Sequence, residues 1–453
     1  MVLKSLRAGL RSRDPGTVNS AIVGVGLLGP LATEAVPDLI DICRRELKSP
    51  PGGNGLCGVP IESALSLVGP RAFPYLFQLS GRSGQPLPTF AIHAIAQMNA
   101  SPAEMRPGVM ALGATALRCQ PEATWEALEA LGRLGPASAP AVPSLIRLLR
   151  NPCPIPEQSL DEDDERTTSF TGTHVLLVLG SIGKDAAPSV PAILESMPAD
   201  PDNAVQALAQ IGRPAVPFLT QALQSPHEVF REGAARAIAA IGPRAVAAIP
   251  VLQKHLSDAS PRVRAAAVHA WIALNPQNPA SLTQAAKLLL DPDPMVRLET
   301  AEALHDGKSQ LAVLPELVRA LGDSEAEVRI RVVDDIGSLG TAASSAVPDI
   351  MVLLKDPVDT VRQTAALAIV ALGKPDKSLV SRLVANLSDE DARVRGAAAD
   401  VLGQMGADAT SALPALQIAS QDADPDVQKI AKRAIGRIQT PALPTVVPLD
   451  NES

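Results

Sequence analysis

The chain has few aromatic residues: only 2% of its 453 residues are Phe, Trp or Tyr, although 46% are hydrophobic. Its apolar content is therefore mainly Ala, Leu, Val and Ile, which are typical of closely packed helices. This hydrophobic fraction is sufficient for a buried core and excludes a chain that is disordered throughout. The shortage of aromatic side chains also removes the anchors that strong binding hot spots usually carry.

The chain also lacks a surplus of basic residues. It has 40 Lys and Arg against 48 Asp and Glu, which gives a net charge of -8. Proteins that bind DNA or RNA usually carry a basic footprint, so we expect no nucleic acid among the partners.

Cysteines are few, and no two of them form a C-x-x-C pair. The four are Cys43, Cys57, Cys119 and Cys153. This spacing predicts neither a zinc site nor a redox motif. In a chain of this length we also expect no disulfide framework.

Recognisable catalytic motifs are absent as well. The sequence has no G-x-x-x-x-G-K-[ST], H-E-x-x-H or G-x-S-x-G motif. Gly24, Gly26 and Gly29 match G-x-G-x-x-G, but no strand is predicted before them. The six histidines are scattered, with no two at ligand spacing on one helix. We therefore expect no catalytic residue, no cofactor and no metal.

The N-terminal segment imitates a signal peptide or a membrane span. Four basic residues among the first 13 precede an uncharged stretch, residues 15–33. Asn19, Ser20 and several glycines and prolines make this stretch a poor span. Because it also fits the internal repeat described next, we interpret it as a repeat helix, with no membrane partner, and predict a cytoplasmic location.

A repeat of about 33 residues runs through the chain. Its clearest mark is a pair of residues spaced by 33, 33, 32, 33, 33 and 33 positions: Phe230-Arg231, Val263-Arg264, Val296-Arg297, Val328-Arg329, Val361-Arg362, Val394-Arg395 and Val427-Gln428. Gly or Asn follows most pairs twelve residues on, as at Gly242 and Asn275, and equivalent positions upstream bring the total to thirteen repeats. Such a residue fits a helix that ends in the left-handed αL conformation.

Two further columns define the helices of each repeat. Pro has no N–H to donate and is favoured in the first turn of a helix, so we expect a helix of about three turns to begin at each member of one column. Those prolines are Pro37, Pro143, Pro191, Pro250, Pro315, Pro348 and Pro414. An Asp column predicts a short turn before the second helix, whose apolar residues, such as Val361, Ala365 and Ile369, form one stripe.

This layout resembles the HEAT-repeat family, and in particular the short bacterial repeats related to phycobilisome lyases. The matching features are the Val-Pro start of helix A, the turn Asp, and the Val-Arg and terminal Gly of helix B, as in residues 389–406. The resemblance implies an all-α fold: an α-solenoid, or armadillo-like α-α superhelix, of about 13 helix-turn-helix repeats. It covers one domain, residues 1–439, irregular over 1–185 and regular over 186–439. Residues 440–453 form a Pro-rich tail that we expect to be flexible.

Each Arg of the repeat follows an Asp by about six residues. Stacking should therefore alternate Asp and Arg in a structural ladder between repeats, with hydrogen bonds to the turns. The expected members are Asp258, Arg264, Asp291, Arg297, Asp323, Arg329, Asp356, Arg362, Asp389 and Arg395.

The face of helix B that is not used for packing should line the concave surface. Its predicted partner-binding residues are Arg236, His269, Glu302, Asp334, Asp400 and Arg433, which carry both signs of charge. Trp125 and Trp271 are expected in the core. Because the first repeat begins at Met1, we expect either a partner or preceding residues of a longer product to cover its outer side.

Long insertions interrupt the repeat between helices A and B at residues 49–58, 80–88 and 151–168. Insertions in a solenoid map to loops on one edge. The third holds an acidic run, Asp161, Glu162, Asp163, Asp164 and Glu165. We expect this edge to contact a basic surface of a partner; a solvated flexible loop is the alternative.

Together these features predict a non-catalytic scaffold that binds protein partners through its concave helix-B face and its N-terminal loop edge. The resemblance also implies an alternative, an enzyme-associated subunit of the phycobilin lyase type. A metal-dependent oxidoreductase similar to deoxyhypusine hydroxylase is the weaker alternative, because that family carries repeated His-Glu pairs and only His227-Glu228 is present here.

Overall fold

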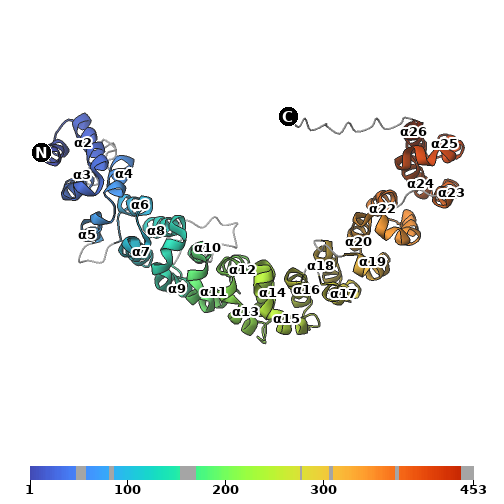
Figure 1. Cartoon of the computed structure of the whole chain (residues 1–453), viewed down its shortest axis with the longest axis horizontal. Coiled ribbons are helices and arrows are strands. Elements are labelled where there is room, and N and C mark those ends of the chain that lie inside the picture. Colours follow the sequence, from blue (N-terminus) through green and yellow to red (C-terminus); the bar gives the residue numbers. More distant parts are fainter. Residues whose placement is uncertain are drawn as a thin grey trace, which may run out of the picture. The chain divides into compact units, whose positions relative to one another are not determined.

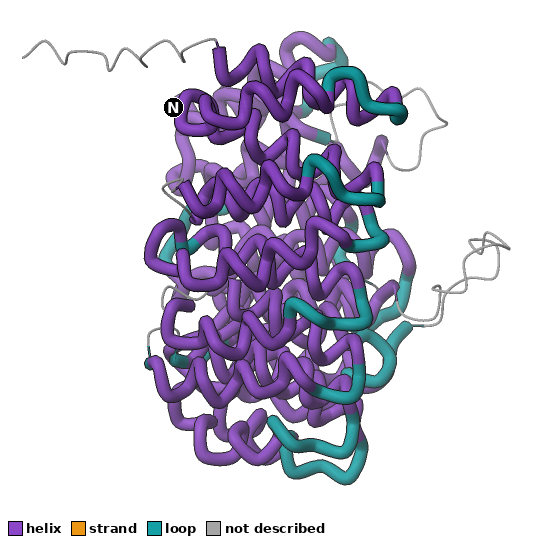
Figure 2. Tube along the Cα trace, turned by 90° about the vertical axis from the view of Figure 1, so that its right-hand side faces the viewer, coloured by secondary structure: helices purple, strands orange, loops and turns teal. Residues whose placement is uncertain are grey.

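The computed structural model describes residues 1–46, 58–80, 86–153, 170–275, 278–305, 310–372 and 377–439. These residues form α-helices, 3-10 helices and short turns, and none of them belongs to a β-strand (Figure 2). The all-α prediction is confirmed. The contacts divide the chain into two compact units, Met1–Val251 and Leu252–Ser453.

In the first unit, seven A helices alternate with seven B helices (Figure 1). The A helices are α1 (Val2–Leu10), α3 (Val36–Glu46), α5 (Phe73–Phe77), α7 (Pro102–Ala116), α9 (Val142–Arg150), α11 (Val190–Ser196) and α13 (Val216–Ala222). The B helices are α2 (Pro15–Leu28), α4 (Val59–Val68), α6 (Thr89–Gln97), α8 (Pro121–Leu134), α10 (Phe170–Ile182), α12 (Pro201–Ile211) and α14 (Glu228–Ile241).

The eighth A helix, α15 (Ile249–His255), contains the boundary between the units. In the second unit the other A helices are α17 (Pro279–Ala286), α19 (Leu314–Ala320), α21 (Val347–Ile350), α23 (Lys377–Asn386) and α25 (Leu413–Ala419). The B helices are α16 (Pro261–Leu274), α18 (Pro294–His305), α20 (Ala326–Ser338), α22 (Asp359–Leu372), α24 (Ala392–Met405) and α26 (Pro425–Gln439). The described residues thus contain the thirteen predicted helix pairs.

The proline column starts the A helices, as predicted. Pro348 is the second residue of α21 and Pro414 the second residue of α25. The expected length of three turns is wrong for several of these helices. In repeat eleven the α-helix covers only Val347–Ile350, and a 3-10 helix, Met351–Lys355, continues it to the turn.

The glycine column ends the B helices with a conformation that differs from the prediction. Gly242 has φ 64° and ψ -143°, and Gly406 has φ 58° and ψ -134°. These angles lie outside the αL region, in a region that is essentially restricted to glycine. The backbone adopts them because the chain passes directly from helix B into a 3-10 helix. Asn275 ends α16 with φ -137° and ψ 55°, so the expected equivalence of Asn and Gly at this position is wrong.

Small residues allow neighbouring B helices to pack closely. A Cβ atom on Gly403 of α24 would lie 2.7 Å from the Cα of Ala434 on α26. The predicted core position of Trp271 is confirmed, since its ring is 5% exposed and its Nε1 donates to the backbone oxygen of Ser281 at 2.9 Å. The same prediction for Trp125 is wrong: it is 38% exposed, with its ring edgewise against His174.

Two helical stretches, Pro15–Glu46 and Glu228–His255, are long and apolar enough to span a membrane by length and composition. Each consists of two α-helices joined by a 3-10 helix, α2 to α3 in the first and α14 to α15 in the second. The interpretation of residues 15–33 as part of the repeat is therefore confirmed, because α2 is the B helix of the first pair.

Candidate functional site

Arg side chains link consecutive turns in the second unit. Arg264 donates from Nε and Nη2 to both carboxylate oxygens of Asp291, at 2.8 and 2.7 Å. Its Nη1 donates to the backbone oxygen of Asp258, in the turn of its own repeat, at 2.8 Å. The same pattern recurs in three further pairs: Arg297 with Asp323, Arg329 with Asp356, and Arg395 with Asp422.

The ladder is interrupted at Arg362, which corrects the prediction for this repeat. Arg362 retains the bond to its own turn, Nη1 to the backbone oxygen of Asp356 at 2.7 Å, but its Nη2 donates to Asp359. Asp389, the expected acceptor, instead binds Nζ of Lys355 at 2.6 Å.

The sequence contains the reason for this exchange. The other ladder repeats have Pro or Ala three residues before the Arg: Pro261, Pro294, Ala326 and Ala392. In this repeat a carboxylate, that of Asp359, stands three residues before the Arg, and it accepts the hydrogen bond from Nη2 of Arg362. Lys355 is the only cation among the residues that directly precede the ladder Asp residues.

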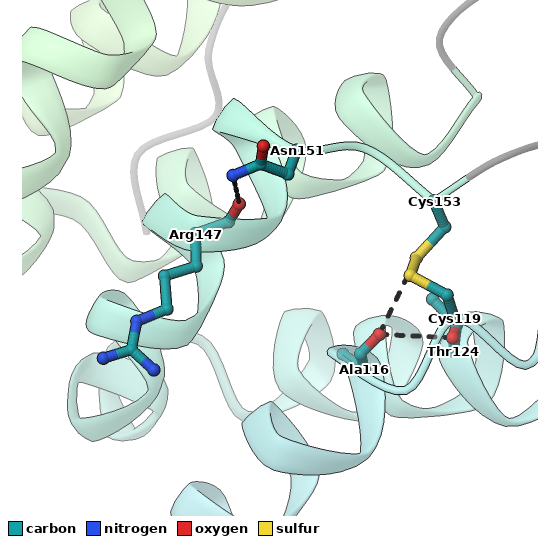
Figure 3. Close-up of a disulfide and its surroundings, with 6 residues drawn as sticks. All are labelled: Ala116, Cys119, Thr124, Arg147, Asn151 and Cys153. Carbon is teal, nitrogen blue, oxygen red and sulfur yellow. Dashed lines mark hydrogen bonds between the residues drawn. A yellow bond between two sulfur atoms is a disulfide. The ribbon is translucent and has the colours of Figure 1, made fainter.

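In the first unit, other chemistry joins the equivalent turns. Thr173 of α10, one residue after the position that Arg occupies in the second unit, donates to Asp200, in the turn before α12. Cys119, between α7 and α8, and Cys153, after α9, form a disulfide (Figure 3). The expectation of no disulfide framework is wrong for this pair, because residues 34 positions apart meet where two repeats stack.

A second set of contacts joins the B helices directly. Arg236 of α14 binds Asp202 of α12 at 2.6 Å, and His269 of α16 binds Glu299 of α18 at 2.6 Å. Glu302 lies 4.0 Å from Arg331 of α20. Of the six partner-binding residues predicted on the helix-B face, these three thus contact charged groups of the adjacent repeat, whereas Asp334 is exposed.

His93 of α6 contacts carboxylates on two other B helices. Its Nδ1 lies 3.2 Å from Glu62 of α4 and its Nε2 lies 2.6 Å from Glu126 of α8. Burial opposes the charged imidazole, but hydrogen bonding to Glu126 and the negative charges of both carboxylates outweigh it, so the pKa of His93 is raised. His93 therefore links three consecutive B helices.

The remaining two predicted residues, Asp400 and Arg433, lie in one groove. The groove has a volume of about 590 Å³ and is lined by three successive B helices of the second unit, α22, α24 and α26. Asp359 and Arg362, the pair that interrupts the ladder, line its edge. The ladder is thus interrupted at the same place where the surface forms a groove. We therefore take this groove as the candidate site.

The chemistry of the groove suits binding. It holds acidic, basic, amide and aliphatic side chains, and no Cys, His or Ser lines it. Across the described part of the chain, no group of three His, Cys, Asp or Glu side chains is arranged to hold a metal ion. The acidic run Asp161 to Glu165 lies outside the described residues.

Helix pairs that stack in series define the α-solenoid class of proteins. A family model for HEAT repeats matches residues 190–272, 314–380 and 380–452. The chain belongs to the HEAT-repeat family. Its resemblance to the phycobilisome-lyase type remains a prediction.

One solved structure supports the helical solenoid fold, and two others are similar at lower scores. The karyopherin Kap121p, bound to the SUMO protease Ulp1p, is 15% identical with a TM-score of 0.50, and the match covers 93% of this chain and 47% of that chain. The chain thus spans about half of that karyopherin. An engineered protein is 18% identical over 97% of this chain and 99% of that chain, with a TM-score of 0.28. Human deoxyhypusine hydroxylase is 20% identical over 56% and 96%, with a TM-score of 0.24. No curated protein matches the sequence.

Proposed function

We propose that the protein is a non-catalytic scaffold that binds a protein partner in the groove on α22, α24 and α26. The observation that carries this proposal is the hollow of about 590 Å³ formed by three consecutive repeats, with polar and apolar groups on its surface. A groove of this kind can accommodate a polypeptide segment, and stacked repeats present such surfaces. The likeness to a karyopherin bound to a protein partner agrees with this role.

Site-specific photo-crosslinking tests the proposal. Leu367 lines the groove and is 58% exposed, so a photo-reactive amino acid there should crosslink to the partner in a native lysate. Ile418 on α25 is a matched control, because it is aliphatic and 78% exposed but does not line the groove. The partner crosslinked at position 367 should then form a complex when purified. Equal crosslinking at both positions, or none at 367, would contradict the proposal.

The N-terminal loop edge is a second proposed contact of the same scaffold. It depends on the acidic charges at Asp161 to Glu165. Deleting residues 157–165 should reduce recovery of the partner if this edge takes part, and unchanged recovery would remove it from the proposal. The lyase-like alternative predicts a visible absorbance band after reconstitution with a tetrapyrrole.

A further inference from the structure

Most charges in the groove are already paired within the protein. Asp359 accepts hydrogen bonds from Arg362 and Gln363. Asp400 accepts from Gln404 at 2.8 Å and from Arg437 at 3.4 Å. These groups fix the groove's shape and have little free capacity for a ligand.

The cations of α26 are the exception. Lys429 and Arg433 lie one helical turn apart on the side of α26 that lines the groove, and both are exposed. Neither forms an ion pair with any carboxylate in the described part of the chain. Arg437 continues the same row and pairs with Asp400. We call Lys429, Arg433 and Arg437 the α26 cation row.

The acidic residues of α26 do not cancel this row. Asp424 accepts from the backbone N–H groups of Asp426 and Val427, and Asp426 lies in the first turn of the helix. Negative charge at a helix N-terminus is stabilised by the backbone N–H groups there. The cations without a carboxylate partner among the described residues, Lys429 and Arg433, therefore lie further along α26.

Between the charged residues, the groove is lined by small and apolar side chains. Ala366, Gly396 and Ala397 leave room above the backbone, and Leu367 and Ile430 offer aliphatic surface. Leu367 is 58% exposed and so presents apolar surface inside the hollow. An apolar side chain of a ligand would cover it.

We propose that the groove binds an acidic segment of the partner protein, with carboxylates on Lys429 and Arg433 and an apolar residue over Leu367. This inference rests on the proposed function and adds the chemical class of the partner. It is notable in a chain of net charge -8, whose surface would otherwise repel acidic segments.

The same charges argue against a polyphosphate ligand. A nucleic-acid strand carries a negative charge at every nucleotide, so it would meet Asp359, Asp400 and Asp426, which also line the groove. A peptide can place its carboxylates near the α26 cation row only and leave uncharged residues elsewhere. We therefore favour an acidic peptide over an RNA or DNA strand.

Fluorescence anisotropy with labelled synthetic peptides tests the proposal on the full chain. The probes are three short peptides with the same leucines, separated by Glu, Gln or Lys. The Glu peptide should bind about tenfold more tightly than the Gln peptide and more tightly still than the Lys peptide, as expected for a few rim charges. Affinity for the Glu peptide should fall as salt is added.

Charge reversal provides the matched variants. Arg433→Glu should weaken binding of the Glu peptide and strengthen binding of the Lys peptide. Lys432→Glu makes the same change in charge sign at an exposed position of α26 that does not line the groove, and it should leave both affinities nearly unchanged. Circular dichroism checks that both variants fold.

Three results would overturn the inference. The first is that all three peptides bind equally or that none binds. The second is that Arg433→Glu and Lys432→Glu have indistinguishable effects. The third is that a labelled oligouridine binds more tightly than the Glu peptide and that Arg433→Glu abolishes this binding. In each case crosslinking at Leu367 still decides separately whether a protein occupies the groove.

Discussion

Arg329 donates from Nε and Nη2 to the two carboxylate oxygens of Asp356, at 2.8 and 2.9 Å, and both residues are buried. The pair connects helix α20 of one repeat to the turn of the next. Its geometry is bidentate, and Arg329 also binds two backbone oxygens of its own turn. A side chain with this many charged and polar contacts supports two repeats at once.

Replacing Arg329 by Ala should therefore destabilise the second unit by about 3–5 kcal/mol, because it leaves the buried carboxylate of Asp356 without its cation. Urea denaturation followed by circular dichroism measures the loss, and hydrogen exchange should show it first in α20 and α22. Arg393→Ala is the control, since Arg393 pairs with Asp391 at the exposed surface and should hardly change the denaturation midpoint. A midpoint for Arg329→Ala close to the native one would refute the ladder's structural role.

Replacing Gly242 by Ala should cost about 1–3 kcal/mol through backbone strain alone. A Cβ there would meet nothing within 4 Å, so no steric clash contributes. A Cβ on Gly436 would also meet nothing within 4 Å, but this residue lies inside α26, where Ala is favoured over Gly by about 1 kcal/mol. Thermal denaturation of the two variants should thus give shifts of opposite sign, and shifts of the same sign would be incompatible with this explanation.

Asp335 should make stability depend on pH between about 4 and 6. Burial raises the pKa of Asp335 to about 6 from 3.8, against the opposing effect of its hydrogen bond to His305. Its Oδ2 is buried with no hydrogen-bond partner among the residues described. The folded state therefore holds a proton that the unfolded state releases, and the stability that this proton contributes is lost as pH rises through about 6.

Asp335→Asn removes this titration. Its stability relative to the native chain should increase from pH 4 to pH 7, by at most about 3 kcal/mol. Asp334→Asn, an exposed neighbour, is the control and should nearly retain the native pH dependence, because the charge of Asp334 is only a minor cause of the raised pKa of Asp335. Urea midpoints at a series of pH values measure both, and parallel curves for Asp335→Asn and the native chain would contradict the prediction.

Removing the disulfide with Cys119→Ser and Cys153→Ser should lower the stability of the first unit by about 3–4 kcal/mol, as expected for a closed loop whose ends are 34 residues apart. Hydrogen exchange should localise the effect to α7, α8 and α9, while α24 remains protected. The disulfide is typical of oxidising compartments, whereas a cytoplasmic location is our expectation from the sequence. Trapping free thiols in intact cells decides between them: cysteines that react with a maleimide before lysis support the cytoplasm.

The fold could be predicted from the repeat because the start and end of each helix depend on residues close by in the sequence. A proline that starts a helix and a glycine that ends one act within a few residues of their own position. The Asp and Arg columns predicted which groups would meet, since stacking places equal positions of adjacent repeats side by side. At Arg362, however, the columns gave the wrong partner, because they take no account of the competing carboxylate of Asp359 one helical turn away.

Other features depend on distances that a sequence does not contain. Cys119 and Cys153 form no C-x-x-C pair, and their separation of 34 residues, about one repeat, brings them together only because repeats four and five stack. The groove arises where Gly396 and Ala397 stand between larger side chains on two neighbouring helices. Asp400 and Arg433 were predicted as members of a long face, but only packing showed that they share one hollow.

Gln428 occupies the final ladder position among the described residues. It occupies the Arg position of the last repeat, and its Nε2 donates to the backbone oxygen of Asp422 at 2.7 Å, which preserves the bond to its own turn. An amide has no net charge, so this position needs no carboxylate from a following turn. A single change from guanidinium to amide thus separates two interactions that Arg makes elsewhere: the hydrogen bond to the turn of its own repeat and the ion pair with the Asp of the next repeat. Conversely, Gln428→Arg would place a guanidinium there without a carboxylate acceptor. The Asp of an added repeat could then bind it, so this substitution would favour a longer array.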